Sequence, residues 1–139
     1  TESRVEVVAP AWHDHVTAPA VVFTGGPVAA DVVIGIGRPT GEPVPGYAPL
    51  VGGVGSFDLN SFPSPDESSW AGLRLFAGSA GWTRGQLEDE IREGAWWVLP
   101  AAPDDVLTSD PSTLWPRVLR RERPPTSWFA NCPLDVSSN

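Results

Sequence analysis

Apolar residues alternate with other residues over 73–78, where Leu73, Leu75 and Ala77 occupy every second position. This period of two predicts a strand with one face more buried than the other. Residues 95–99 form a short, nearly continuous apolar run closed by a proline, which is typical of a strand covered on both faces. With a helix between them, the two strands are expected to form a right-handed crossover between parallel neighbours, or to lie apart in a mixed sheet.

The helix between these strands is predicted over residues 83–93 from the signals at its ends. Thr83 and Gln86 have the spacing of a capping box, in which the hydroxyl accepts the backbone N–H of Gln86 and the amide reaches back. Trp82 and Leu87 have the spacing of a hydrophobic staple across the same end. The glycine that follows the helix is able to adopt the left-handed conformation that ends helices. We therefore expect a helix with one narrow buried stripe and an acidic, solvated face.

A second helix is expected over 113–122, with its N-cap at Ser112 or Thr113 so that Pro116 falls in the first turn. Together the patterns predict a single α+β domain, in which two main helices pack on a mixed, mostly antiparallel sheet. The apolar face of the second helix consists of Leu114, Trp115, Val118 and Leu119. Further strands are predicted at 20–23, 32–36 and 51–59.

The amino-acid composition narrows the classes of partner that this protein is expected to bind. The chain has 139 residues, 41% of them hydrophobic, with seven tryptophans, which indicates one packed domain. Its net charge of −8 argues against a surface that binds phosphate backbones. The one basic run is interpreted as a solvated helix end. We expect no nucleic-acid or membrane partner, and the single cysteine, Cys132, fits a reducing cytoplasm. The basic run consists of Arg117, Arg120, Arg121 and Arg123.

Few residues carry the signals of catalysis or metal binding. His13 and His15 flank Asp14, an arrangement able to ligate a metal or move protons, yet no further ligand is signalled nearby. Two exposed or hydrogen-bonded imidazoles are the favoured interpretation. Cys132 has no local histidine to activate it as a nucleophile. The sequence therefore predicts no catalytic residue, no metal site and no cofactor.

Two glycine-rich turns leave room for a ligand. The turn at residues 25–27 resembles a phosphate-binding loop, but it has no lysine and Pro27 removes a donor, so a structural turn is favoured. The turn at residues 78–81 precedes a predicted helix N-terminus, whose free N–H groups are able to receive an anion. A capped helix end is the alternative there. The candidate ligand-binding residues are Gly25, Gly26, Ser79, Gly81 and Thr83.

Several of these segments together resemble one known family. The segments are Phe23-Thr24-Gly25-Gly26-Pro27-Val28, Phe76-Ala77-Gly78-Ser79-Ala80-Gly81-Trp82, Gly85-Gln86-Leu87-Glu88, Glu90-Ile91, Trp96, Leu114-Trp115 and Val118-Leu119, in that order. The set is similar to the AlgH/YqgE family of bacterial proteins, actinobacterial branch, over nearly the whole chain. Its Gly-Trp-x-x-Gly-Gln-Leu-Glu core is the most specific part.

The resemblance implies a cytoplasmic α+β protein, and some members of the family are labelled transcriptional regulators. It offers no established catalytic residues to transfer. The matching positions are therefore assigned a structural role. These positions are Trp82, Gly85, Gln86, Leu87, Glu88 and Trp96.

The resemblance also implies a longer domain. Family members open with a strand-rich third that ends in an Asn-Arg-Pro motif, and this sequence begins after that motif. We therefore interpret residues 1–139 as one AlgH/YqgE-like domain, truncated at its N-terminus. Such a domain is expected to show an open sheet edge and exposed apolar surface. Pro116 also departs from the family pattern, in which arginine or glycine is usual.

The sequence favours three functions to different degrees. The first is a non-enzymatic regulatory or protein-interaction domain with an unknown protein partner, favoured by the acidic surface and by the lack of a nucleophile–base pair. The alternative is a small-molecule or anion-binding protein, or an enzyme, that uses the glycine turns 25–27 and 78–81. Direct DNA binding is the least favoured, because the cations are few.

Overall fold

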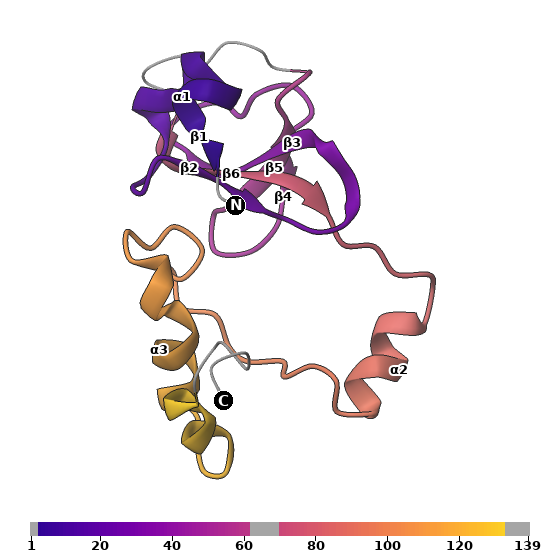
Figure 1. The fold of residues 1–139 in the computed structure, drawn as a ribbon. Helices are drawn as coiled ribbons and strands as arrows, with labels where there is room; N and C mark the ends of the chain where they lie inside the picture. The colour runs from indigo at the N-terminus through magenta and orange to yellow at the C-terminus, as the bar shows by residue number, and fades with distance from the viewer. Residues whose placement is uncertain (1–2, 62–69, 133–139) are drawn as a thin grey trace.

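The computed structural model describes residues 3–61 and 70–132, and its strands form one mixed sheet (Figure 1). The order of strands in the sheet is β1–β2–β6–β3–β5–β4. The strands are β1 (Ser3–Arg4), β2 (Val21–Thr24), β3 (Val28–Pro39), β4 (Ala48–Pro49), β5 (Gly55–Asp58) and β6 (Trp70–Ser79). The α-helices are α1 (Val5–Val8), α2 (Gln86–Arg92) and α3 (Leu114–Arg120). In the view of Figure 1, α1 lies above the sheet, whereas α2 and α3 lie below it. The 3₁₀ helices are η1 (Pro10–His15), η2 (Pro111–Thr113) and η3 (Thr126–Asn131).

Strand β6 lies at the centre of the sheet. It pairs in parallel with β2 on one side and antiparallel with β3 on the other. The strands predicted at 20–23 and 32–36 correspond to β2 and to the middle of β3. The run 51–59 divides, because Gly52 and Gly53 both have positive φ and form a turn ahead of β5.

The core lies between the sheet and the segment that contains α1 and η1. Leu73 and Leu75 of β6 are fully buried, which confirms the apolar face predicted from their alternation. Trp12 of η1 packs against Phe57 of β5 with ring centroids 5.5 Å apart, and Phe57 stacks on Trp70 at 4.7 Å. The buried residues are consequently concentrated in the half of the molecule that contains the sheet.

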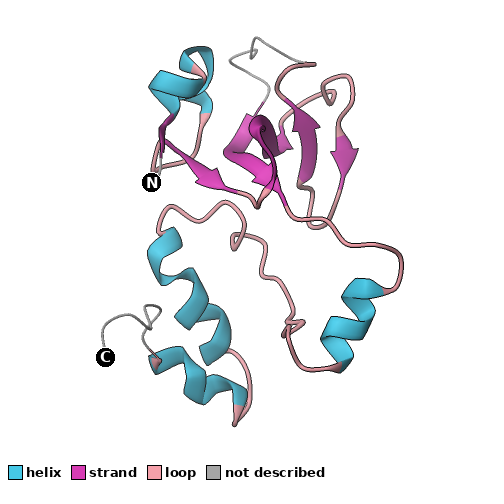
Figure 2. Cartoon of the chain, turned by 45° about the vertical axis from the view of Figure 1, so that its right-hand side comes forward, coloured by secondary structure: helices cyan, strands magenta, loops and turns pink. Residues whose placement is uncertain are grey.

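The predicted strand over residues 95–99 is wrong, and so is the parallel crossover built on it. These residues belong to an irregular segment, residues 93–110, which we call the arm and which connects α2 to η2 (Figure 2). Trp96, Trp97 and Val98 are exposed. The apolar run is partly buried by aromatic side chains of α3 and η3 and not by neighbouring strands. The parallel partner of β6 is β2.

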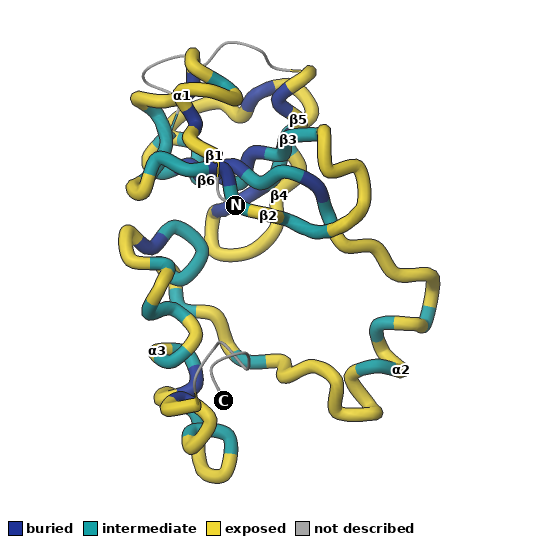
Figure 3. Tube along the Cα trace, in the orientation of Figure 1, coloured by how far each residue is buried: buried dark blue, intermediate teal, exposed yellow. Residues whose placement is uncertain are grey.

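Both predicted main helices exist, but they are shorter than expected and lie away from the sheet (Figure 3). The α3 helix begins at Leu114 with Thr113 at its N-cap, so that Pro116 falls in the first turn as predicted. The α2 helix lies at the end of extended connections, and its seven residues include none that is buried. The expectation that the two main helices pack on the sheet is therefore not met, since α3 packs mainly against η2 and η3.

The two glycine turns meet where the chain crosses the end of β6. Because β6 lies between β2 and β3, the connection between those strands passes over its last residues. A Cβ atom on Gly25 would lie 2.2 Å from the carbonyl oxygen of Gly78, and one on Gly26 would lie 2.3 Å from the carbonyl carbon of Ser79. Gly78 itself has a φ of +75°. The glycines are thus required by backbone contact at the crossing.

Arg74 of β6 connects the sheet to the arm. The sequence places it on the less apolar face of the strand, yet its side chain is only 4% exposed. Its guanidinium donates to the carbonyl oxygens of Val106 (3.0 Å), Ala18 (3.3 Å) and Thr108, and it lies 4.9 Å from the ring centroid of Phe23. Burial lowers the pKa of Arg74. One buried cation therefore holds two loops from distant parts of the sequence.

Replacing Gly78 with alanine is expected to reduce the free energy of unfolding by about 2–4 kcal/mol, because the new Cβ meets backbone and the φ is positive. Gly81→Ala is the matched control, since an added Cβ there has no atom within 4 Å. Urea unfolding measures both. Equal midpoints for Gly78→Ala and the unsubstituted protein would contradict the role of the crossing.

Arg74→Met is expected to reduce the free energy of unfolding by about 3 kcal/mol, because three carbonyl groups lose a charged donor. It should also speed limited proteolysis within the arm. Arg120→Met serves as the control, because Arg120 is exposed. If both variants are cut at the same rate, Arg74 does not anchor the arm.

Candidate functional site

The structure separates the candidate ligand-binding residues into two places. Gly25, Gly26 and Ser79 lie at the crossing over β6, where the two backbones touch. The N–H of Gly25 already donates to the carbonyl oxygen of Ala77, at 2.7 Å. Gly81 and Thr83 lie beyond the strand, on the exposed connection to α2. The crossing therefore leaves little space for an anion between its turns.

The N-terminus of α2 differs from the predicted capping box. Its N-cap is Gly85 in the left-handed conformation (φ +85°), and its first helical residue is Gln86. The Gln86 side chain accepts a hydrogen bond from the Thr83 backbone N–H at 3.1 Å, which is one half of the box. The other half is absent, because the backbone N–H of Gln86 donates to the Thr83 carbonyl oxygen. A left-handed glycine two residues after Thr83 moves the helix start to Gln86.

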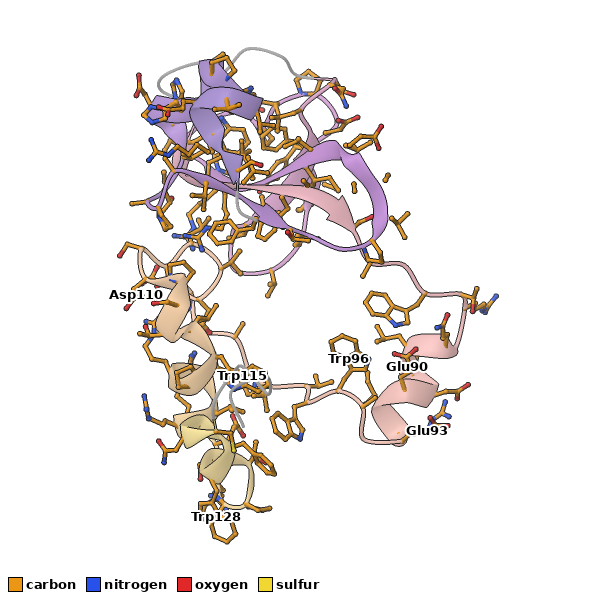
Figure 4. All side chains as sticks on the ribbon, viewed as in Figure 1. Glu90, Glu93, Trp96, Asp110, Trp115 and Trp128 are labelled. Carbon is orange, nitrogen blue, oxygen red and sulfur yellow. The ribbon has the colours of Figure 1, made fainter. Side chains whose placement is uncertain are left out.

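Glu90 joins both flanks of α2, a role that the sequence analysis missed. Its Oε2 accepts the indole N–H of Trp96 at 2.7 Å and that of Trp82 at 3.1 Å, while Gln86 donates to its Oε1 at 3.0 Å (Figure 4). The two indole rings meet edge to face at 5.8 Å. The hydrogen bonds from Trp96, Trp82 and Gln86 lower the pKa of Glu90, in that order of effect. Residues 82–96 thereby form a closed loop held by one carboxylate.

A groove of about 680 Å³ lies between the arm and α3. Trp97 of the arm forms one wall, and its ring stacks with that of Trp115 at 5.7 Å and packs against Phe129 at 5.0 Å. Trp115 projects from α3 toward the arm, as Figure 4 shows. The apolar face predicted for α3 lines this groove. The lining residues are Gly94, Ala95, Trp96, Trp97, Leu99, Pro111, Leu114, Trp115, Val118 and Leu119.

Polar contacts fix α3 beside the arm. Arg121 donates to Asp105 at 2.6 Å, and Arg117 donates to the Thr108 hydroxyl at 2.8 Å. The hydrogen bond from Arg121 lowers the pKa of Asp105. Asp110 accepts the hydroxyl groups of Ser112 and Thr113 at 2.6 and 2.8 Å, which lowers its pKa as well. The basic run therefore divides, since Arg117 and Arg121 bind the arm, whereas Arg120 and Arg123 face solvent.

None of the other candidate groups lines the groove or takes part in the closure by Glu90. His13 and His15 belong to η1, and His13 Nδ1 lies 2.9 Å from an Asp14 carboxylate oxygen on the surface. Within residues 3–61 and 70–132, no three histidine, cysteine or acidic side chains are placed to hold a metal. Cys132 is an exposed free thiol.

Acidification is expected to open the loop at residues 82–96. Because the pKa of Glu90 is lower in the folded protein, its stabilising effect is complete at neutral pH. The effect is lost as the pH falls below the unfolded glutamate value of about 4.3 and through the folded pKa. Glu90→Gln should shift the indole N–H resonances of Trp82 and Trp96 in NMR spectra at pH 7, and the difference from the unsubstituted protein should shrink toward pH 3.

Glu93→Gln is the control for this experiment, because Glu93 lies one turn away and is exposed. Indole resonances that are the same in Glu90→Gln and in the unsubstituted protein at pH 7 would contradict the proposed closure.

Sequence comparisons relate this chain to one protein family. The model of the AlgH-like family matches residues 2–126. A UPF0301 protein of Thermobifida fusca is 40% identical over 148 residues, which cover all of this chain and 75% of the relative. One from Streptomyces coelicolor is 43% identical over 133 residues, or 92% of this chain and 69% of the relative.

Solved structures show the same fold. A crystal structure of a Corynebacterium diphtheriae protein superimposes with a TM-score of 0.81 and 33% identity, over 94% of this chain and 70% of that protein. The solution structure of AlgH from Pseudomonas aeruginosa gives a TM-score of 0.51 at 23% identity, over 77% of this chain and 58% of AlgH, which concerns the fold alone.

The helices of the described residues are all too short to cross a bilayer. These relatives are bacterial, and the matches extend over the strands, the arm and α3 alike. On this evidence the chain belongs to the AlgH-like family.

Proposed function

We propose that this chain is a non-enzymatic protein-interaction domain that binds an apolar segment of a partner in the groove between the arm and α3. The observation that carries the proposal is the groove itself, about 680 Å³ in volume. Its size is within the range of binding sites in proteins. Two of its walls are stacked tryptophan rings that remain partly exposed, Trp97 and Trp115.

The chemistry of the lining supports binding and not turnover. None of the residues that line the groove has a side chain that exchanges protons near neutral pH. Apolar and aromatic surface that is left exposed is typical of contacts between proteins. Aromatic rings also bury a large area at a low entropic cost, which makes them frequent anchors in interfaces.

A regulatory role would act through this contact. The labels of some family members as transcriptional regulators fit such a role, whereas the net charge of −8 disfavours direct contact with DNA. We place the protein in the cytoplasm, which suits its single exposed cysteine. Small-molecule or anion binding at the glycine turns is less favoured, because the Gly25 N–H is already donated and the backbones touch.

Trp115→Ser is expected to abolish the capture of partners while leaving the fold intact, because the Trp115 side chain is nearly half exposed. Trp128→Ser is the matched control, since Trp128 is 69% exposed and lies outside the groove lining. Affinity capture from lysate with all three baits, followed by quantitative mass spectrometry, should recover the same proteins with the unsubstituted bait and Trp128→Ser. Untagged copies of this chain count among them.

The proposal fails if Trp115→Ser recovers the same proteins as the other two baits, or if none of the baits recovers any. A thermal-shift panel of nucleotides and phosphorylated metabolites tests the glycine turns in parallel. Stabilisation that Gly81→Ala removes would favour the small-molecule function instead.

A further inference from the structure

Three consecutive residues of the groove wall follow directly after the end of α2. Gly94, Ala95 and Trp96 all line the groove. The α2 helix ends at Arg92, and Glu93 is its C-cap. The direction in which the chain leaves α2 therefore determines where this part of the wall lies.

A Schellman motif at the end of α2 fixes that direction. Gly94 adopts the left-handed conformation, with a φ of +81°. Its backbone N–H donates to the carbonyl oxygen of Ile91 at 3.1 Å, and the N–H of Ala95 donates to that of Glu90 at 2.9 Å. These two hydrogen bonds define the motif and satisfy carbonyl groups that a helix end would otherwise leave without partners. The backbone of Glu90 thereby holds the first residues of the wall.

The side chain of Glu90 holds the next residue of the wall. Its carboxylate accepts the indole N–H of Trp96 at 2.7 Å, the shortest of the three hydrogen bonds that it accepts from side chains. A charged acceptor makes such a bond stronger than one between neutral groups. Figure 4 shows Trp96 beside Glu90, on the side of α2 that faces α3. Because Trp96 is 48% exposed, the hydrogen bond restrains a ring that its neighbours do not enclose.

Glu90 acts on the groove from outside it. It is not one of the residues that line the groove, so any effect on a ligand passes through Ala95 and Trp96. The indole N–H is the only hydrogen-bonding group of a tryptophan side chain, and in Trp96 the carboxylate uses it. The Trp96 side chain therefore presents only apolar surface at this end of the groove.

We propose that Glu90 is a positioning residue for the groove: its carboxylate holds the indole of Trp96 in place, and the affinity of the groove for an apolar ligand depends on this contact. A wall that is already in place loses less conformational entropy when a ligand binds. Trp82 contributes from the other flank of α2, because its ring meets that of Trp96 edge to face. This inference rests on the proposed function and concerns the control of the same groove.

Binding of Nile red, a neutral apolar fluorescent probe, tests the role of Glu90. Glu90→Gln is expected to weaken probe binding about three- to tenfold, because the hydrogen bond to a charged acceptor is lost. Glu93→Gln is the matched control, since it removes the same charge at the C-cap of α2 and should bind the probe as the unsubstituted protein does. Circular dichroism of each variant confirms its folding. Equal affinities for Glu90→Gln and the unsubstituted protein overturn the positioning role.

A double-mutant cycle separates positioning through the hydrogen bond from a general loss of stability. Trp96→Phe keeps an aromatic ring in the wall but removes the indole N–H. If Glu90 acts through that N–H, the double variant Glu90→Gln with Trp96→Phe should bind Nile red no more weakly than Trp96→Phe alone. Losses of affinity that multiply in the double variant contradict the inference.

Trp115→Ser distinguishes the failure of this inference from the failure of the proposed function. If probe binding depends on Trp115 but not on Glu90, the groove remains the binding site and only the positioning role fails. If Trp115→Ser leaves probe binding unchanged, the groove does not take up apolar ligands, and both proposals fail.

Discussion

The buried guanidinium of Arg74 is the contact on which the relation between the two halves of the molecule depends. It leaves the central strand β6 and donates to carbonyl groups in the loop before β2 and in the arm. A charge is tolerated in such a place only where several acceptors and an aromatic ring replace water. The contact fixes residues 106–108 against the sheet, and the polar contacts of Arg117 and Arg121 then orient α3 from that point.

The position of β6 in the sheet explains the glycine turns. Inserting a strand between β2 and β3 forces their connection across its end, where the two backbones approach too closely for any Cβ at Gly25 or Gly26. The order of strands in the sheet therefore explains why these positions, which resemble the family pattern, are glycines. A ligand is not needed to explain it, and the hydrogen bond from Gly25 to Ala77 uses the donor that an anion would require.

Away from the sheet, tryptophan side chains and single charged groups stabilise the local conformation of the chain. Glu90 gathers two indole N–H groups around α2, and Trp97 fills the space between the arm and the rings of Trp115 and Phe129. These contacts determine the conformation of the region that contains α2, the arm and α3, but they leave much of its aromatic surface exposed to water. That incomplete burial is the physical basis of our proposal that the groove binds a partner.

Short-range patterns in the sequence determined several elements of the structure. The alternation around Leu73 and Leu75 predicted a buried strand face, and the apolar spacing in 113–122 predicted the face of α3. The position of Pro116 limited the N-cap of α3 to Ser112 or Thr113, because such features depend on neighbours a few residues away. The tertiary structure alone decided the irregular course of residues 95–99, the burial of Arg74 and the meeting of the glycine turns. Each of these depends on which segments lie side by side, and the partners of Arg74 are 32 to 56 residues distant in the sequence. The hydrophobicity of a residue predicts that its side chain is buried, whereas only the folded chain specifies which residues bury it.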